Sequence, residues 1–468
     1  MVDSIELSLS EEKLLEYIQK KESFLLFDLR RKENYEKAHI EGSVHAVCDT
    51  RAKETIMPKI PKNIKIVLLD DGGKMAAETA KMMHSMGLDA HYLKGGMKSW
   101  SGNTVQGIPQ RSIDAQTLWS KLQKNENLFL LDVRDRDEFS EFKIPGSINI
   151  PLTEVFKQEN ISKIPKDKDI ITICPHGNRA MVATFALARN NINAHVLEGG
   201  LAGWSQVLNP VKAANDPTVY QLEKVGKGCL SYVVVSEGQA IVIDPLYPPQ
   251  KYQELAQKNG FKIIKVIDTH QHADHISSAQ DLSNLTKSEI YESNLEVWDR
   301  TAKFLSDKDE LKFGNSTLNV MHTPGHTPGS LSYLIDEKFV FTGDILFIES
   351  IGRPDLRDKA EEFASELYDS LHNKLLNLPP ETIVFPAHHG ETVKPVDGVF
   401  STTIEKANKH DVLKLSKDEF IKQVVGLTLP RPMNYTKIIQ INKGSIPLNA
   451  KEIPDLELGP NRCSIAGQ

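Results

Sequence analysis

Residues 269–275 read Thr-His-Gln-His-Ala-Asp-His and directly follow the apolar segment 263–268. Three histidines and a carboxylate at these spacings, in a loop after a buried strand, can converge on one or two metal ions. Three later segments place a further candidate ligand after a predicted strand: His326 in Gly-His-Thr-Pro-Gly, Asp344 in Thr-Gly-Asp and His388 in Pro-Ala-His. The sequence therefore predicts a metal centre along one edge of a β-sandwich. Its candidate ligands are His270, His272, Asp274, His275, His326, Asp344 and His388.

The chain around this loop has the pattern of a β-rich domain. Segments 219–224, 231–236 and 239–244 are predicted as short strands, followed by a helix near 249–259 and a strand over 263–268. The preceding segment 208–217 is rich in Pro, Asn and Ala, and we interpret it as a linker. Cys229 falls within the strand pattern, so we expect it in the hydrophobic core.

The first 208 residues contain an internal repeat. Asp28, Gly42, Gly95 and Trp100 recur as Asp132, Gly146, Gly199 and Trp204, each pair 104 positions apart. One offset held over this length indicates two copies of one domain, at about 5–105 and 110–208. In each copy short apolar segments (25–29, 64–69 and 90–93; 128–133, 170–173 and 194–197) alternate with helical stretches (76–87; 180–191). That alternation predicts a mainly parallel α/β sheet, with ligands bound at the carboxyl ends of its strands.

The second copy has a cysteine at such a strand end. Cys174 opens the loop Cys-Pro-His-Gly-Asn-Arg, which runs from Cys174 to Arg179 and begins a helix. Backbone N–H groups, the helix dipole and Arg179 are each expected to lower the pKa of Cys174 and prepare a nucleophile. The first copy has Asp70 at the equivalent position, and Cys48 lies outside the loop. A carboxylate cannot carry sulfane sulfur, so we expect the first copy to be inactive, with a role in packing or docking.

Both copies resemble rhodanese domains. The second copy has the Asp-x-Arg strand end, the Ile-Pro-Gly-Ser segment, the Cys-x-x-Gly-x-Arg loop and the late Gly-Gly-x-x-x-Trp. The resemblance implies that Cys174 carries a persulfide and that Arg179 stabilises charge in the loop.

Residues 218–395 resemble the metallo-β-lactamase superfamily through the four motifs that carry the candidate ligands. Within it they resemble both glyoxalase II and ETHE1-like persulfide dioxygenases. Residues 347–355, which include Gly352-Arg353-Pro354-Asp355, and the C-terminal Leu-Gly-Pro-Asn-Arg-Cys of 458–463 favour the dioxygenases. The implied architecture is multidomain: two rhodanese-like α/β domains (1–108 and 109–208, the first inactive) followed by a metallo-β-lactamase αββα sandwich with a C-terminal extension (217–468).

The dioxygenase resemblance implies one Fe(II) per chain, held by His270, His326 and Asp344. Two histidines and a carboxylate leave coordination positions open for substrate and O₂. His272, Asp274, His275 and His388 would then surround these ligands or line a second metal position. Arg353 is a candidate for binding a substrate carboxylate. Cys463 either reaches the metal pocket and holds substrate sulfur or is a packed terminal thiol.

The expected function is iron-dependent oxidation of a low-molecular-weight thiol persulfide by O₂ to sulfite, coupled to rhodanese transfer among thiosulfate, sulfite and persulfide. One alternative is a glyoxalase II-like thioester hydrolase with two Zn. A second alternative is a sulfur-relay or sensor module with a structural metal. The physiological thiol (glutathione, coenzyme A or another) and the direction of sulfur flow stay open.

The composition limits the partners. The formal net charge is −7, and the pI is about 6.1, which does not favour nucleic acid as a partner. The start of the chain lacks the pattern of a secretory signal, and no apolar run approaches the ~20 residues that span a bilayer. The four cysteines form no Cys-x-x-Cys pair, so we expect reduced thiols in a cytoplasmic protein that does not bind membranes. A homo-oligomer stays open.

Overall fold

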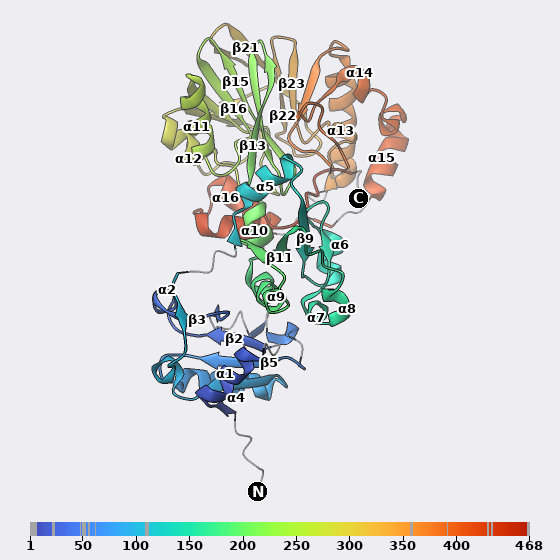
Figure 1. Ribbon diagram of the computed structural model, residues 1–468. Helices are drawn as coiled ribbons and strands as arrows, with labels where there is room; N and C mark the ends of the chain where they lie inside the picture. Colours follow the sequence, from blue (N-terminus) through green and yellow to red (C-terminus); the bar gives the residue numbers. More distant parts are fainter. Residues whose placement is uncertain are drawn as a thin grey trace. The chain divides into compact units, whose positions relative to one another are not determined.

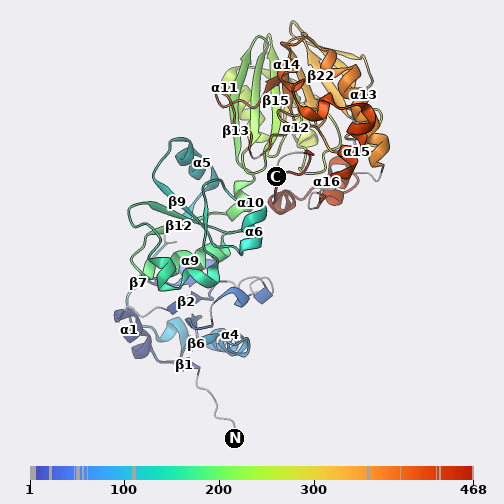
Figure 2. The same cartoon turned by 90° about the vertical axis from the view of Figure 1, so that its right-hand side faces the viewer.

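The computed structural model describes residues 7–20, 24–46, 48, 53–54, 57–60, 62–107, 112–355, 359–390, 392–427, 430–431 and 434–465. The chain forms two compact units, Met1–Trp204 and Ser205–Gln468 (Figures 1 and 2). The boundary expected between residues 108 and 109 falls outside the described residues. Among the described residues, no helix has the length and apolar character needed to cross a bilayer.

Each copy in the first unit contains a five-stranded sheet in which all paired strands are parallel. The order in the first copy is β1 (Ser8–Leu9), β6 (Asp89–Leu93), β5 (Lys65–Leu69), β2 (Phe24–Asp28) and β4 (Val44–His45). The order in the second copy is β8 (Ser112–Ile113), β12 (Ala194–Leu197), β11 (Asp169–Ile173), β9 (Leu128–Asp132) and β10 (Ile148–Asn149). The equivalent strands occupy equivalent places, which confirms the predicted duplication and its parallel α/β class.

Helices flank these sheets and two short strands complete the first copy. The helices are α1 (Glu11–Gln19), α2 (Lys32–Lys37), α4 (Lys74–Ser85), α5 (Ala115–Gln123), α6 (Arg136–Glu141), α7 (Leu152–Val155), α8 (Gln158–Ile161), α9 (Asn178–Arg189) and α10 (Gly200–Trp204). Strands β3 (His39–Ile40) and β7 (Thr104–Val105) pair with each other. Helix α9 packs on its own sheet and also contacts β2 and β4 of the first copy. The first copy therefore covers part of the helix that follows the Cys174 loop.

The repeated Asp-x-Arg motif forms a buried ion pair in each copy. Arg30 and Arg134 each fold back on the aspartate two residues earlier, with Nη2–Oδ2 distances of 2.6 Å to Asp28 and 2.7 Å to Asp132. All four side chains are buried. A buried charge is stable only when it is paired and hydrogen-bonded, so the motif fixes the end of the central strand in both copies.

The second unit is a sandwich of two sheets (Figure 1). The seven-stranded sheet has the order β13 (Leu208–Asn215), β14 (Thr218–Lys224), β15 (Cys229–Ser236), β16 (Gln239–Ile243), β17 (Lys262–Ile267), β18 (Glu289–Ser293) and β19 (Lys303–Leu305). The six-stranded sheet has the order β20 (Glu310–Phe313), β21 (Ser316–His322), β22 (Leu331–Ile335), β23 (Phe339–Gly343), β24 (Ile383–Pro386) and β25 (Thr402–Thr403). Apolar side chains of both sheets form the core between them.

Helices cover the outer faces of the sandwich. Helices α11 (Gln250–Asn259) and α12 (Ala279–Thr286) pack on the seven-stranded sheet, and α13 (Ala360–Asn373) and α15 (Lys417–Gly426) share a core with the other. This is the predicted αββα arrangement. The helices α14 (Ile404–Ala407), α16 (Tyr435–Lys443) and α17 (Ile453–Leu456) complete the unit.

One expectation is wrong: segment 208–217 is not a linker. Residues 208–215 form β13, which pairs with β14 in an antiparallel register from Leu208–Lys224 to Asn215–Thr218. Pro210 is tolerated because β13 is the edge strand, where one side of the backbone needs no partner strand. Segment 208–217 has the composition of a loop, but its residues 208–215 form a strand of the sandwich.

Candidate functional sites: a metal centre and a cysteine loop

Three predicted ligands from three strand ends meet at one point. His270 follows β17, His326 lies between β21 and β22, and Asp344 follows β23. The Nε2 atoms of His270 and His326 lie 3.6 Å and 3.4 Å from Oδ2 of Asp344. Their three ligand atoms all lie within 4.8 Å of one another, and all three residues are buried. This spacing suits two imidazoles and a carboxylate around one metal ion.

The two imidazoles are oriented for coordination. His326 donates from Nδ1 to the carbonyl oxygen of Arg353 at 2.9 Å, which leaves Nε2 with its lone pair toward Asp344. Nδ1 of His270 lies 3.0 Å from the Thr269 hydroxyl. Burial lowers the pKa of both His270 and His326, so the rings are neutral at neutral pH, the form that binds a metal.

A second group surrounds Asp274. Its carboxylate lies 3.0 Å from Nδ1 of His275 and 2.8 Å from Nε2 of His388. The Cys229 thiol, at the start of β15, donates to Oδ2 of Asp274 at 3.4 Å. Cys229 is buried in the core, as expected. Its thiol also contacts this polar group, which the sequence did not predict. His388 joins the two groups, since its Nδ1 lies 2.6 Å from Oδ1 of Asp344.

The two buried carboxylates require positive charge. Burial opposes ionisation of Asp344, but the charge of His388 holds the pKa of that carboxyl well below its usual range. Burial also opposes protonation of His275, yet the Asp274 carboxylate outweighs it and raises the pKa of His275 to about 10. Buried carboxylates of this kind are satisfied by protonated partners or by metal ions.

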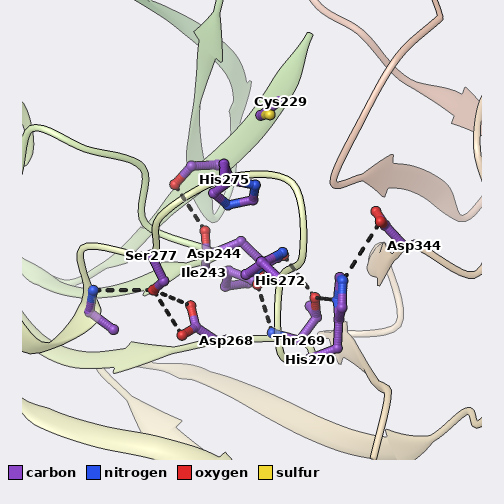
Figure 3. A network of polar contacts seen from close by, with 12 residues as sticks. Cys229, Ile243, Asp244, Asp268, Thr269, His270, His272, His275, Ser277 and Asp344 are labelled. Carbon is purple, nitrogen blue, oxygen red and sulfur yellow. Dashed lines mark hydrogen bonds and ion pairs between the residues drawn. The ribbon is translucent and has the colours of Figure 1, made fainter. Parts of the chain in front are cut away.

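His272 is held by Asp244, a residue outside the predicted ligand motifs. Asp244, which follows β16, lies 3.1 Å from Nε2 of His272 and accepts hydrogen bonds from the Thr269 backbone N–H and hydroxyl (Figure 3). Its carboxylate thereby fixes the orientation of the His272 ring and the start of the loop 269–277, which we call the ligand loop. A carboxylate behind a metal-site histidine commonly has this role.

The residues present fit a metal. Among the described residues, several buried ligand atoms have no hydrogen-bond partner: His270 Nε2, His272 Nδ1, His275 Nε2 and Asp344 Oδ2. Buried polar atoms are normally satisfied, and two of these atoms, His270 Nε2 and Asp344 Oδ2, belong to one group of candidate ligands, so this group fits a bound cation.

Arg353 does not fit its predicted role in substrate binding. Its guanidinium donates to both oxygens of Asp355 at 2.7 and 2.6 Å and to the carbonyl oxygens of Pro430 and Arg462 at 2.9 and 3.1 Å. The residue is 1% exposed. These contacts engage the side chain inside the protein, where it ties the segment after Asp344 to the C-terminal extension.

The structure brings Cys463 to the metal centre. Its sulfur lies within 4.8 Å of ligand atoms of Asp344 and His388, and the residue is 1% exposed. Burial raises the pKa of the Cys463 thiol well above its usual range. Cys463 therefore lies at the candidate metal pocket and is also packed in the interior, and a role in holding substrate sulfur stays a prediction.

In the second copy, Cys174 directly follows β11 and faces the start of α9. Its sulfur accepts hydrogen bonds from the backbone N–H groups of Gly177 at 3.1 Å and Ala180 at 3.4 Å. Gly200 lies behind the loop at a positive φ of 59°, and a Cβ there would overlap the carbonyl oxygen of Cys174. The repeated Gly-Gly motif thus permits the close approach that shapes the loop.

The pKa expected for Cys174 needs correction. Burial raises the pKa of the thiol above its usual value, although backbone N–H groups and the charge of Arg179 oppose that rise. The charge of Arg179 is partly neutralised by Glu138, whose carboxylate accepts from its guanidinium at 2.7 and 2.6 Å. Neither the depth of burial nor the partner Glu138 was evident from the sequence.

The first copy fills its own loop. Asp70 accepts hydrogen bonds from the backbone N–H groups of Gly72 and Ala76, both at 2.9 Å, and from Gly73. Gly73 and Ala76 are equivalent to Gly177 and Ala180 in the repeat. The Asp70 carboxylate therefore takes the place of the sulfur and occupies the anion-binding N–H groups of its loop.

Comparison with known families gives two matches. The Metallo-beta-lactamase superfamily matches residues 225–388, and the Rhodanese-like domain matches residues 10–103 and 114–207. The human mitochondrial persulfide dioxygenase ETHE1 is 32% identical over 208 residues, which are 44% of this chain and 78% of the human protein.

The chain is also similar to a hydrolase and to a solved structure. A cytoplasmic hydroxyacylglutathione hydrolase of Arabidopsis thaliana is 33% identical over 209 residues, 43% of this chain and 78% of the plant protein. The crystal structure of ETHE1 from Myxococcus xanthus aligns at 29% identity and a TM-score of 0.43, covering 51% of this chain and 99% of that one.

Proposed function

Because the chain belongs to the metallo-beta-lactamase superfamily, as an ETHE1-like member fused to two rhodanese-like domains, we propose that it oxidises a thiol persulfide at one iron site. In this reaction a thiol persulfide, O₂ and water give the thiol, sulfite and two protons. The observation that carries the proposal is the buried group of His270, His326 and Asp344. Their ligand atoms converge, and His270 Nε2 and Asp344 Oδ2 have no hydrogen-bond partner.

His270, His326 and Asp344 would hold ferrous iron. When bound, the iron supplies the coordination positions and electrons through which O₂ reacts with the persulfide sulfur. The chain's own groups set the environment: Arg353 fixes the His326 tautomer through its carbonyl oxygen, and Asp244 fixes the ligand loop. All three ligand side chains are buried, and low solvent exposure strengthens the electrostatic interactions at the site. The Cys463 thiol lies beside Asp344, where it would contact the substrate's sulfur.

The second copy would supply or remove sulfur. A Cys174 thiolate attacks the outer sulfur of thiosulfate, the S–S bond breaks, and sulfite leaves with the bonding electron pair. An acceptor thiolate then takes the outer sulfur, and Cys174 leaves as a thiolate. The N–H groups of Gly177 and Ala180 stabilise the negative charge on the loop sulfur in both steps.

Oxygen uptake tests the dioxygenase half. Anaerobically purified protein loaded with Fe(II) should consume O₂ and release sulfite when given glutathione persulfide, with coenzyme A persulfide tested alongside. His326→Ala should abolish uptake, whereas His322→Ala, the same change at the end of β21, should retain it. Uptake that persists in His326→Ala would contradict the assignment of this ligand.

Transfer from thiosulfate to cyanide tests the sulfurtransferase half. Cys174→Ser should lose it while Cys48→Ser retains it, because Cys48 lies outside the loop. His326→Ala should transfer at the wild-type rate. Transfer by the Cys174→Ser protein would refute the sulfur-carrier role.

One observation favours a second candidate. Asp274, His275 and His388 form a complete buried group beside the first, as two-metal hydrolysis of a glutathione thioester would need. A hydroxyacylglutathione hydrolase is also among the relatives. Metal content separates the two functions: one iron per chain supports oxidation, and two zincs support hydrolysis.

A further inference from the structure

The ligand loop is attached to the C-terminal extension by one buried side chain. Asn442, in α16, donates from Nδ2 to the carbonyl oxygens of His272 at 2.9 Å and His275 at 2.8 Å. Its Oδ1 accepts from the backbone N–H of Ser277 at 2.9 Å. The residue is 3% exposed. One carboxamide therefore spans the part of the loop that contains His272, Asp274 and His275.

A second residue of the extension fixes the next position of the loop. Glu457 follows α17, is fully buried, and accepts from the backbone N–H of Ile276 at 2.8 Å. It also pairs with Lys224 at the end of β14. The superfamily match ends at residue 388, so both anchors lie in the extension beyond it.

We infer that Asn442 is a positioning residue of the metal centre, and that the C-terminal extension sets how tightly the protein holds its metal. The carboxamide uses both of its N–H donors and its oxygen on the loop backbone, which fixes the peptide planes between residues 272 and 277. Loss of these bonds would let the ligand loop adopt other conformations in the metal-free protein. The ligand His270 lies in the same loop, two residues before the anchored segment, and groups that orient a metal ligand contribute about 10- to 100-fold to metal affinity.

An aspartate at this position would be unsuitable although it has nearly the same shape. Its carboxylate has no donor for the carbonyl oxygens of His272 and His275, and it would place negative charge against both. Asn442→Asp therefore removes the two donated bonds with little change in volume. Asn442→Ala removes all three bonds without adding charge.

A second asparagine of the extension offers a matched control. Asn434 directly precedes α16 and donates to the carbonyl oxygens of Asp455 and Leu456 at 3.4 and 3.2 Å. Asn434→Asp makes the same chemical change on contacts within the extension. The Asn434→Asp variant therefore shows how a disturbed extension affects Co(II) affinity when the hydrogen bonds of Asn442 to the ligand loop are intact.

The experiment is a competition for Co(II) between the full-length protein and a chromophoric chelator, under anaerobic conditions. Asn442→Asp and Asn442→Ala should each lower Co(II) affinity about 10- to 100-fold, while Asn434→Asp keeps the wild-type value. At saturating Co(II), the ligand-field absorption of both Asn442 variants should also shift, because a loss of fold stability alone would not change the ligand geometry. Thermal unfolding of the metal-free variants shows which of them fold.

Three results would overturn the inference: wild-type affinity in both Asn442 variants, an equal loss in Asn434→Asp, or an unchanged absorption spectrum. The inference rests on the metal site of the proposed function, but Co(II) binding is measured without persulfide or O₂. A protein that binds Co(II) tightly and consumes no O₂ would contradict the proposed reaction and leave the role of Asn442 supported. Tight Co(II) binding that Asn442→Asp does not weaken would contradict the role of Asn442, whatever the protein does with persulfide and O₂.

Discussion

The buried ion pair between Lys224 and Glu457 allows the extension's contribution to stability to be measured. Both side chains have 0% exposure, and the pair connects the end of β14 to the segment after α17. Lys224→Met leaves the Glu457 carboxylate with two neutral donors, the Ile276 N–H at 2.8 Å and the Gln206 amide at 2.9 Å. The carboxylate then has no direct ion pair, since Lys227 Nζ donates to the backbone carbonyl oxygen of Glu457 at 3.0 Å and not to its carboxylate.

Removing one partner of a buried ion pair costs about 3–5 kcal/mol, because the remaining charge is desolvated and unpaired. Replacing both partners costs much less, since no charge stays behind. We therefore expect Lys224→Met and Glu457→Gln each to lower the free energy of unfolding by about 3–5 kcal/mol. The double variant should lose less than the two single losses together, with a coupling of about 2 kcal/mol or more.

Equilibrium urea unfolding of the full-length protein, followed by circular dichroism, measures these values. Lys338→Met is the matched control, because Lys338 pairs with Asp216 at 3.2 Å while 51% exposed, and an exposed pair contributes only ~0–1 kcal/mol. Additive losses in the double variant, or a loss in Lys224→Met no larger than in the control, would show that this ion pair does not contribute the expected stability.

Three further predictions concern the other sites. Arg179→Gln should raise the pKa of Cys174 further and move the pH profile of its alkylation by iodoacetamide to higher pH, because a nearby positive charge is lost; an unmoved or lowered profile would contradict this. Asp70→Cys in a Cys174→Ser background should gain no thiosulfate sulfurtransferase activity, since Met75 stands where the second copy has Arg179; any gain would show that the arginine is dispensable. Arg353→Met should lower the melting temperature while folded protein keeps its KM for the persulfide; a raised KM at unchanged melting temperature would restore the substrate role.

The sequence predicted the elements whose pattern is local. Apolar strands ending in a polar ligand motif need only the residues of one segment, which is why the strands leading to His270 and Asp344 were found. The internal repeat predicted a shared topology, and the two sheets have the same strand order.

What the sequence did not predict depends on contacts between distant segments. Cys229, Asp244 and Asn442 reach the metal centre through strand order and through the return of the extension, and no local spacing marks them. The internal contacts of Arg353 were not predicted for the same reason: its charge suggested a substrate-binding group, whereas in the structure it donates to Asp355 and to two backbone carbonyl oxygens. The edge strand at 208–215 was missed because proline and asparagine are also common in loops.

The metal dependence of the two candidate reactions separates persulfide oxidation from thioester hydrolysis. One metal-free preparation is divided, loaded with Fe(II) or with Zn(II), and each half is given glutathione persulfide with O₂ and, separately, a glutathione thioester. We expect the Fe(II) half to bind one iron per chain and to consume O₂ with equimolar sulfite, and neither half to hydrolyse the thioester rapidly. Rapid thioester hydrolysis by the Zn(II) half with two zincs per chain, and no O₂ uptake by the Fe(II) half, would contradict the proposed persulfide oxidation.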